Sequence, residues 1–244
     1  MPRTIPLTLI VAATTKLGIG QGGKLPWPSL QTEMGYFRRV TTRVPAPTAA
    51  ADSSSSSSTT TSSSNSKAQN AVIMGRKTWD SIPPKFRPLK GRLNVVITRS
   101  GTVAGLEAAQ AKGDTVLVAN SLEQALEALN KQDEASSESP QLGEAFIIGG
   151  STLYTAALAL PQAKRVLLTK IYREYECDTF LPFDLDGEKA RGEGWVRKGW
   201  DQLERYVGSD VVEGVASTTK GTYHGDGKVT EGDVEFEFCL YERD

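Results

Sequence analysis

The sequence predicts one α/β domain over residues 1–244, with a mostly parallel mixed central β-sheet, an antiparallel C-terminal strand and about four flanking helices. Short apolar runs typical of buried strands alternate along the chain with segments of helical periodicity, which is the pattern of strand–helix–strand units. Residues 234–240 instead alternate apolar side chains with Glu235 and Glu237. This alternation predicts a half-exposed antiparallel strand that closes the sheet as an edge partner.

The composition favours a protein whose partners are small molecules. The 244 residues carry a formal net charge of -1, so no basic excess points to nucleic acid. Two cysteines and one histidine provide neither a disulfide framework nor the usual zinc set, and we expect no metal. His224 stands in a glycine-rich segment that predicts a loop, which argues against catalysis by a central histidine.

No stretch approaches the ~20 apolar residues of a membrane-spanning helix, and we expect no membrane partner. The N-terminus predicts a buried first strand over residues 5–13. That segment imitates a secretory signal, but its apolar run is short and is interrupted by Pro6 and Thr8. We therefore expect a cytoplasmic monomer, with the mitochondrion or nucleus as alternative locations.

Residues 14–23, TTKLGIGQGG, predict a glycine-rich loop near the site, and a helix follows from about Leu30 to residue 41. Ser29, behind the proline-stiffened LPWP segment, is its expected N-cap. Glu33 falls inside the apolar stripe of this helix. An ionised carboxylate on a buried face is costly, so Glu33 forms an internal ion pair, has a shifted pKa or is kept for a ligand. The stripe comprises Leu30, Met34, Phe37 and Val40.

Two segments depart from the pattern of ordered elements. Residues 43–69 change abruptly to Pro, Ala, Ser and Thr, which predicts a disordered insertion between two core elements. Residues 185–233 show only fragments of periodicity. We expect this extended C-terminal region, like the insertion, to lie on the surface.

The remaining segments bring glycine and polar residues to strand ends. Strands are predicted at residues 71–74, 93–98, 115–118 and 166–171, and helices at 76–81, after Ser121 and after Gly150. In sheets of this class, ligands bind beyond the carboxyl ends of the strands. Here those ends carry residues 75–78, 98–100 and 149–152.

These strand ends could bind anions. Gly149 and Gly150 let backbone N–H groups approach a phosphate at a helix N-terminus, although a Gly-Gly pair is also an ordinary tight turn. Arg76, Lys77 and Arg99 could hold a second phosphate, and each could equally be a solvated surface charge. Three such ends favour a dinucleotide, but the G-x-G-x-x-G fingerprint is absent, so an ordinary Rossmann domain is not supported.

Seven motifs occur together: GIGQGGKLPWP, MGRKTWDSIP, PLKGRLNVVITR, IIGGSTLY, VLLTKI, DTFLP and, at the end, VEFEFCLYE. In their order and approximate spacing they resemble the dihydrofolate reductases, and the eukaryotic, fungal type most closely. The resemblance covers nearly all predicted elements up to residue 182. Several independent motifs in the same order are far more specific than any one of them.

The resemblance implies reduction of 7,8-dihydrofolate to 5,6,7,8-tetrahydrofolate by hydride transfer from NADPH, feeding one-carbon metabolism, with antifolate inhibitors as further ligands. Glu33 would bind the amino-pyrimidine edge of the pterin and support protonation of the neighbouring ring nitrogen through water. Trp27 and Leu25 would organise that water and cover the nicotinamide pocket. Thr169 would orient the Glu33 side chain.

The resemblance also implies the binding residues. Arg92, which by itself could equally form a surface salt bridge, would hold the glutamate α-carboxylate of the substrate tail. Arg76, Thr98 and Arg99 would read the 2′-phosphate of NADPH. Substrate contacts are expected from Ile10, Val11, Ala12, Glu33, Met34, Phe37, Ser81, Ile82, Phe86, Leu89, Arg92, Ile148, Tyr154 and Thr169. Cofactor contacts are expected from Ala12, Ile19, Gly20, Gly23, Lys24, Gly75, Arg76, Lys77, Thr78, Thr98, Arg99, Ser100, Ile148, Gly149, Gly150, Ser151, Thr152, Leu153, Tyr154 and Thr179.

Three residues depart from the family's pattern. Met34 stands where vertebrate enzymes usually have Phe, Phe86 where a smaller polar residue is common, and Asn120 where an extra cofactor-binding arginine often lies. Two other functions stay open: a same-fold reductase of a pyrimidine ribose phosphate in riboflavin synthesis, and a catalytically silent folate- or nucleotide-binding module. Glu33 in its LPWP context and the Arg92 clamp argue against the first, and the intact set of Glu33, Trp27 and Gly149-Gly150 argues against the second.

Overall fold

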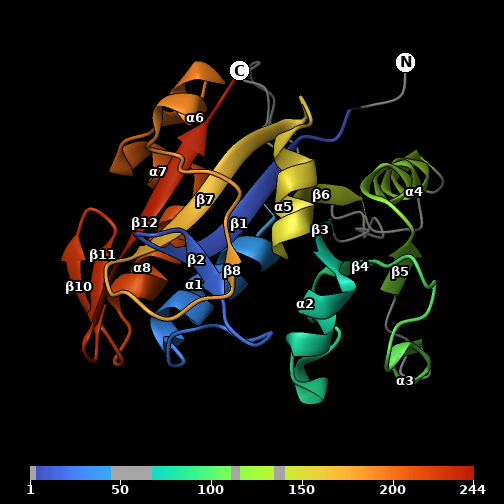
Figure 1. The fold of residues 1–244 in the computed structure, drawn as a ribbon, viewed down its shortest axis with the longest axis horizontal. Helices are drawn as coiled ribbons and strands as arrows, with labels where there is room; N and C mark the ends of the chain where they lie inside the picture. Colours follow the sequence, from blue (N-terminus) through green and yellow to red (C-terminus); the bar gives the residue numbers. More distant parts are fainter. Residues whose placement is uncertain (1–3, 45–67, 111–115, 135–140) are drawn as a thin grey trace, which may run out of the picture.

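A mixed sheet forms the centre of the molecule in a computed structural model that describes residues 4–44, 68–110, 116–134 and 141–244 (Figure 1). Within these residues, ten strands form this sheet in the order β10-β11-β12-β7-β1-β6-β3-β4-β5, and β9 also pairs with β12. Six of these strands lie side by side from β7 to β5. They are β1 (Leu7–Thr14), β3 (Gln69–Gly75), β4 (Leu93–Ile97), β5 (Val116–Ala119), β6 (Leu142–Ile147) and β7 (Ala163–Ile171).

The strands from β7 to β5 are all parallel, as the sequence predicts. β1 lies between β6 and β7, with Leu9 opposite Ile147 on one side and Val166 on the other. The nearly continuous burial of β1 explains its apolar composition, because both of its faces are covered. The predicted first strand is therefore confirmed, starting at Leu7 and ending at Thr14.

The C-terminal end of the sheet is antiparallel, but β12 (Val234–Glu242) is not its edge. It pairs with β7 on one side and with β11 (Lys228–Glu231) on the other, and β11 pairs in turn with β10 (Thr222–Gly225). The short β9 (Val196–Arg197) also pairs with β12. The edge prediction was wrong because the hairpin strands are only four residues long.

Two predictions on single residues in this region were also wrong. His224 lies in β10 and not in a loop, and its ring pairs with the Thr230 hydroxyl on β11. Glu237 is buried and not half-exposed. It accepts a hydrogen bond of 2.5 Å from the Tyr172 hydroxyl and pairs with the Arg197 guanidinium, which compensates for its desolvation.

Helices cover both faces of the sheet and enclose two apolar cores. α4 (Leu122–Glu134), α5 (Ser151–Leu158) and α6 (Glu188–Gly192) pack on the core of one face. The opposite core, which we call the α1-side core, is covered by α1 (Gln31–Thr42), α2 (Arg76–Ser81), α3 (Leu106–Gln110), α7 (Trp200–Val207) and α8 (Ser209–Ala216). The described residues thus form eight α-helices, more than the four expected, because several are too short to show a clear period. None of the described helices has the length and apolar character needed to cross a membrane.

The glycine-rich loop predicted at residues 14–23 contains a strand of its own. β2 (Gly18–Gly20) pairs antiparallel with β8 (Thr179–Phe180) in a separate two-stranded sheet. Beyond β2, the Gly22 backbone N–H donates to Asp178 Oδ2 at 2.7 Å. The segment is therefore tied to the start of the distant DTFLP motif.

The extended C-terminal region of residues 185–233 is not a surface addition. Trp195 and Val229 from this region are buried, as are the inner faces of α7 and α8. These helices have two turns each, and short helices depend on tertiary packing for their stability. Each helix therefore has too few apolar residues for its periodicity to predict a buried helix from the sequence.

Most of the insertion predicted at residues 43–69 lies outside the described residues, which exclude 45–67. Its margins belong to the folded domain. Arg43 follows α1 directly and pairs with Asp210 of α8 at 2.8 Å, and Gln69 is the first residue of β3. The predicted insertion was therefore too wide at both ends.

We expect Leu203→Ala in α7 to lower the free energy of unfolding by about 2–5 kcal/mol, because Leu203 is 1% exposed within the α1-side core. Val196→Ala in the same region is the control, since Val196 is 54% exposed and its truncation should change stability by less than about 0.5 kcal/mol. Urea denaturation measures both. Equal small effects would show that the C-terminal region is peripheral to the core.

Candidate active site

Glu33 is a buried carboxyl group in the first turn of α1. It is 9% exposed, and desolvation raises its pKa from 4.5 to about 7. The Thr169 hydroxyl, from β7, donates to Glu33 Oε1 at 3.3 Å and lowers this pKa, whereas the charge of Glu231 raises it further. No Lys or Arg within the described residues forms a salt bridge with Glu33. Of the three predicted explanations, a shifted pKa is therefore correct and an internal ion pair is not.

The entry of α1 differs from the prediction. Leu30, and not Ser29, is the N-cap residue, and it makes no side-chain capping bond. The cap comes from Glu231 of β11, whose two carboxylate oxygens accept the N–H groups of Gln31 and Thr32 at 2.7 and 2.9 Å. The Ser29 hydroxyl is turned to the sulfur of Met34 instead.

The buried face of α1 is rotated relative to the predicted stripe. Met34 is 50% exposed, whereas Tyr36 is 2% exposed and stacks on Phe238 of β12 with ring centroids 3.9 Å apart. This aromatic pair fixes the rotation of the helix. As a result Glu33 turns inward beside Tyr36, and Met34 is left on the open side.

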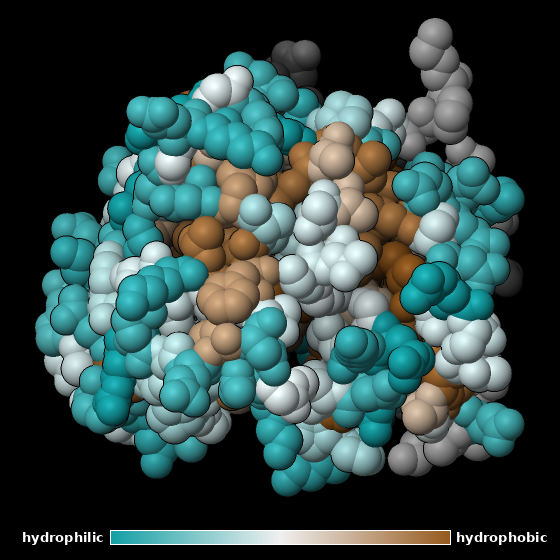
Figure 2. Space-filling view, in the orientation of Figure 1, coloured by the Kyte–Doolittle hydropathy of each residue, from teal (hydrophilic) through white to brown (hydrophobic). Residues whose placement is uncertain are grey.

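Apolar side chains from several elements, many of them expected to contact a ligand, belong to the α1-side core. Ile10 and Trp27 are buried in the α1-side core, and five partly buried residues expected to contact the substrate or cofactor pack on the same core. Figure 2 shows exposed apolar side chains near the middle of the face drawn there, over the region of α5, β2 and β8 in Figure 1. Leu25, Met34 and Phe86 are each at least half exposed. The five partly buried residues are Ala12, Phe37, Ile82, Leu89 and Ile148.

Three expected substrate residues have other side-chain contacts. Val11 alternates to the opposite face of β1 and packs in the other core, so a substrate contact from Val11 rests on its backbone. The Ser81 hydroxyl donates to the Thr78 carbonyl. The Tyr154 hydroxyl donates to the Ile10 carbonyl at 2.9 Å, which ties α5 to β1 at the site.

Arg92 is a buried cation, 8% exposed, so the surface salt bridge was the wrong alternative. Its Nη1 donates to the Thr41 hydroxyl at 2.8 Å, and its guanidinium lies 6.0 Å from the Phe37 ring centroid. Desolvation lowers its pKa to about 10, so it remains charged at neutral pH. The Asn94 side chain fixes the loop by bonding the Leu89 backbone and the Arg92 carbonyl. None of the described carboxylates forms an ion pair with this guanidinium.

The glycine-bearing strand ends meet at one edge of the sheet. β6, β3 and β4 are neighbours, and the Gly75 N–H donates to the Gly149 carbonyl at 2.7 Å. Gly149 has φ +111° and a cis bond to Gly150, and a Cβ at Gly149 would lie 3.3 Å from the Tyr154 hydroxyl. No side chain caps the N-terminus of α5. The open backbone here is of the kind that accepts a phosphate group.

Cationic side chains lie next to this edge. Arg76 and Lys77 open α2, and Arg76 pairs with Asp80 at 2.9 Å. Arg99 follows β4 and is exposed. Thr98 is buried, with its hydroxyl 3.0 Å from that of Ser100. The cation-bearing ends of β3 and β4 are therefore adjacent, as the sequence predicts.

The remaining residues expected to contact the cofactor lie at the start of α5 or in the β2 segment. Thr152 is exposed at the start of α5, while the Ser151 hydroxyl donates to the Phe180 carbonyl and Leu153 is buried. In the β2 segment Ile19 packs on the core, and Gly20 and Thr179 are partners between β2 and β8. Gly23 and Lys24 are exposed beyond β2.

Sequence reasoning missed three groups that support the site. Asp178 anchors the β2 segment, Thr41 and Asn94 hold Arg92, and Glu231 caps α1. Asp178 stands in a quoted motif and could have been noticed as a polar residue beside the site. Glu231 is separated from the helix it caps by about 200 residues and carried no local signal.

Comparisons with known proteins agree on one family. The family model described as "Dihydrofolate reductase" matches residues 64–192. A dihydrofolate reductase of Pneumocystis carinii is 37% identical over 238 residues, which cover 98% of this chain and 97% of that protein. One of Cryptococcus neoformans var. neoformans is 38% identical over 232 residues, covering 87% of this chain and 90% of that protein.

The fold leads to the same family. A solved structure entitled Schistosoma mansoni dihydrofolate reductase aligns with a TM-score of 0.62 and 28% sequence identity, covering 99% of this chain and 100% of that one. The full-length match with the Pneumocystis carinii protein includes the α7, α8 and hairpin region, so this region is not foreign to the family. This chain belongs to the dihydrofolate reductase family.

Proposed function

We propose that the chain reduces 7,8-dihydrofolate to 5,6,7,8-tetrahydrofolate with NADPH. The observation that carries this proposal is Glu33, a carboxyl buried beside an apolar surface with its pKa raised to about 7. A group with a pKa near the working pH can both accept and release a proton. Family membership supplies the reaction class, a reduction that uses a nicotinamide cofactor.

Each residue at the acidic end of the site has a separate task. The Glu33 carboxyl binds the amino-pyrimidine edge of the pterin and supports protonation of the adjacent ring nitrogen through water. The Thr169 hydroxyl, 2% exposed, holds Oε1 of Glu33 from behind. The Trp27 ring is buried, and we assign it to limiting the access of water to this carboxyl, while exposed Leu25 covers the nicotinamide side.

The strand ends suit a dinucleotide cofactor. NADPH, when bound, supplies the hydride. The Gly149-Gly150 turn and the uncapped start of α5 offer backbone N–H groups to its pyrophosphate. We assign Arg99 to the 2′-phosphate, because it is exposed and no ion pair within the described residues engages it, whereas Arg76 is engaged by Asp80.

The other end of the site holds the substrate tail. Arg92 is a buried, charged guanidinium fixed by Thr41 and by the Phe37 ring. A cation buried without a carboxylate partner favours an anionic ligand group, here the glutamate α-carboxylate of the tail. Antifolates with the same charge pattern would bind across the same surface.

The reaction is tested by the loss of NADPH absorbance after addition of dihydrofolate. We expect turnover by the wild type, and we expect Glu33→Gln to lower the hydride-transfer rate by about 100-fold or more at neutral pH, since Gln donates no proton to the pterin. The affinity for NADPH should be nearly unchanged. The absence of wild-type turnover with dihydrofolate would contradict the proposal, and an equal loss of rate and NADPH affinity would make Glu33 a structural residue.

Cofactor choice is tested by Arg99→Ser. Loss of a charge-assisted contact with the 2′-phosphate should weaken NADPH binding by about 10-fold to 100-fold and leave NADH binding unaffected. Arg205→Ser is the control, because Arg205 is an exposed arginine of α7, a helix that packs against β12 and α8. Fluorescence titration gives the dissociation constants of NADPH and NADH for the wild type and both variants. An equal effect of Arg99→Ser on both cofactors would show that Arg99 does not read the 2′-phosphate.

The burial of Glu33 also predicts a pH-dependent stability of the ligand-free protein. Its folded pKa of about 7 lies above the unfolded value of 4.5, so the folded state binds the proton more tightly. The resulting stabilisation is complete below pH 4.5 and is lost as the pH rises through 7, at a cost of about 3 kcal/mol. Glu33→Gln avoids this loss and should gain about 1–3 kcal/mol relative to the wild type between pH 5 and pH 8. Urea denaturation at both pH values measures this gain, and a pH-independent difference would contradict it.

A further inference from the structure

Glu231 joins the C-terminal hairpin to the helix that carries Glu33. Its two carboxylate oxygens accept hydrogen bonds of 2.7 and 2.9 Å from the backbone N–H groups of Gln31 and Thr32, the first two residues of α1. Each oxygen therefore satisfies one of the N–H groups that a helix start leaves without a partner. Glu33 is the third residue of the same turn.

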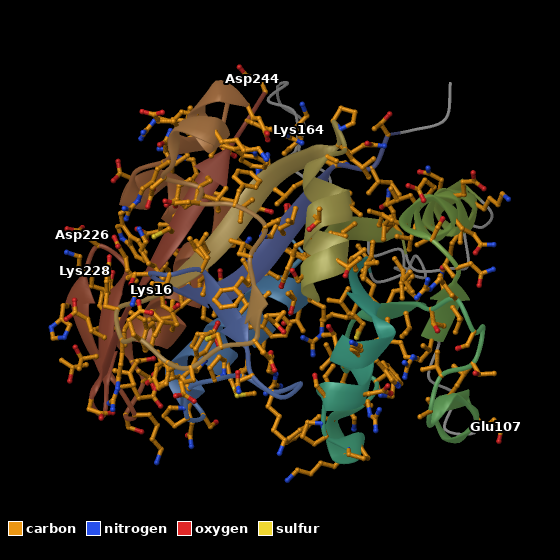
Figure 3. The ribbon with its side chains drawn as sticks, viewed as in Figure 1. Lys16, Glu107, Lys164, Asp226, Lys228 and Asp244 are labelled. Atoms are coloured by element: carbon orange, nitrogen blue, oxygen red, sulfur yellow. The ribbon has the colours of Figure 1, made fainter. Side chains whose placement is uncertain are left out.

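The sheet geometry directs Glu231 toward α1. Residues two apart on a strand share a face, and Val229 of β11 is fully buried in the α1-side core. Glu231 therefore points to the same side as Val229. By contrast, Asp226 and Lys228 lie at the outer edge of this hairpin, where Figure 3 shows them at the periphery of the molecule.

The same turn of α1 has further contacts with the C-terminal region. The Thr32 hydroxyl lies 3.4 Å from that of Thr218, which follows α8. Further along α1, the Arg39 side chain packs against Gly214 of α8. The contact is so close that a side chain at position 214 would clash with Arg39. The region of residues 185–233 therefore sets the orientation of α1 together with the Tyr36–Phe238 pair.

Among the described groups around Glu33, Glu231 brings the negative charge. Tyr36 of α1 and Tyr154 of α5 are fully buried, and desolvation raises the pKa of both well above the usual range. Cys239 of β12 lies next to Tyr36, and desolvation raises its pKa as well. Thr169 of β7 does not titrate. These groups are neutral when Glu33 exchanges its proton.

We propose that Glu231 is a positioning residue for the reductase reaction: it caps α1, fixes the place of Glu33 in the site and keeps a negative charge next to it. This inference rests on the proposed function. Two effects act in the same direction. The Glu231 carboxylate repels the ionised form of Glu33, and it also neutralises the positive pole of the α1 N-terminus, which would otherwise stabilise that form. Both effects favour protonated Glu33.

The variant Glu231→Gln keeps one oxygen acceptor and removes the charge. It should lower the pKa of Glu33 by about half a pH unit. The midpoint is followed in the ligand-free protein by carbon-13 NMR of the glutamate side-chain carboxyl groups, with the Glu33 signal identified by its absence in Glu33→Gln. The pH profile of hydride transfer to dihydrofolate should move to lower pH by the same amount, because the protonated form is the active one.

Glu235→Gln is the matched control. Glu235 is exposed on β12, and strand alternation places it on the opposite face from Val234 and Phe236, which lie in the α1-side core. The variant Glu235→Gln removes one negative charge from β12, the strand next to β11. It should leave the NMR midpoint and the pH profile as they are in the wild type. Glu231→Asp is a second variant that keeps the charge on a shorter side chain, so the melting temperature should fall while the midpoint stays near that of the wild type.

An unchanged NMR midpoint in Glu231→Gln, even with a lower melting temperature, would overturn the proposal, because Glu231 would then be a structural cap only. A midpoint that falls equally in Glu231→Asp and in Glu231→Gln would overturn the role of its charge. The NMR titration needs no turnover. If the wild type fails to reduce dihydrofolate, the proposed function is wrong while the titration still decides the relation between Glu231 and Glu33.

Discussion

The burial of the Glu33 carboxyl is the constraint around which the site is built. Removing a carboxyl from water raises its pKa, here to about 7, because the charged form loses its hydration. The cost is limited by Thr169 of β7, whose hydroxyl donates to one carboxyl oxygen. The position of one proton thus depends on the relative placement of α1 and β7.

The placement of α1 depends in turn on the last third of the chain. Glu231 caps its first turn, Phe238 stacks on Tyr36 in its middle, and Arg39 and Arg43 contact α8 at its end. Each contact comes from a segment that follows the parallel strands in the sequence. A core of parallel strands brings the candidate ligand residues to one edge, and the antiparallel end of the sheet orients the helix that supplies the acid. Precise chemistry at one residue therefore needs support from residues far from it in sequence.

Local pattern was enough to predict the elements whose signal lies within a few residues. The strands of the parallel half, α2 with its bounds and the Ser121 cap of α4 follow from apolar runs, glycines and capping residues. The misplaced charge of Glu33 was visible from helical spacing alone. The rotation of α1, the burial of Glu237 and the cap by Glu231 were not predictable, because each depends on a partner from another element. The opposite orientation of Val11 was implicit in the alternation of β1, and a stricter reading of the strand would have found it.

Desolvation has different consequences for the charge of Arg92 and for the charge of Glu33. Desolvation disfavours the charged form of each, lowering the pKa of Arg92 to about 10 and raising that of Glu33 to about 7. The guanidinium starts so far above neutrality that it keeps its charge, whereas the carboxyl is brought to the point where both forms are populated. Thr41 and the Phe37 ring hold the permanent cation, and Thr169 holds the exchanging acid. Burial thus leaves a fixed positive charge at one end of the candidate site and an exchangeable proton at the other. The proposed substrate, with an anionic tail and a ring to be protonated, requires such an arrangement.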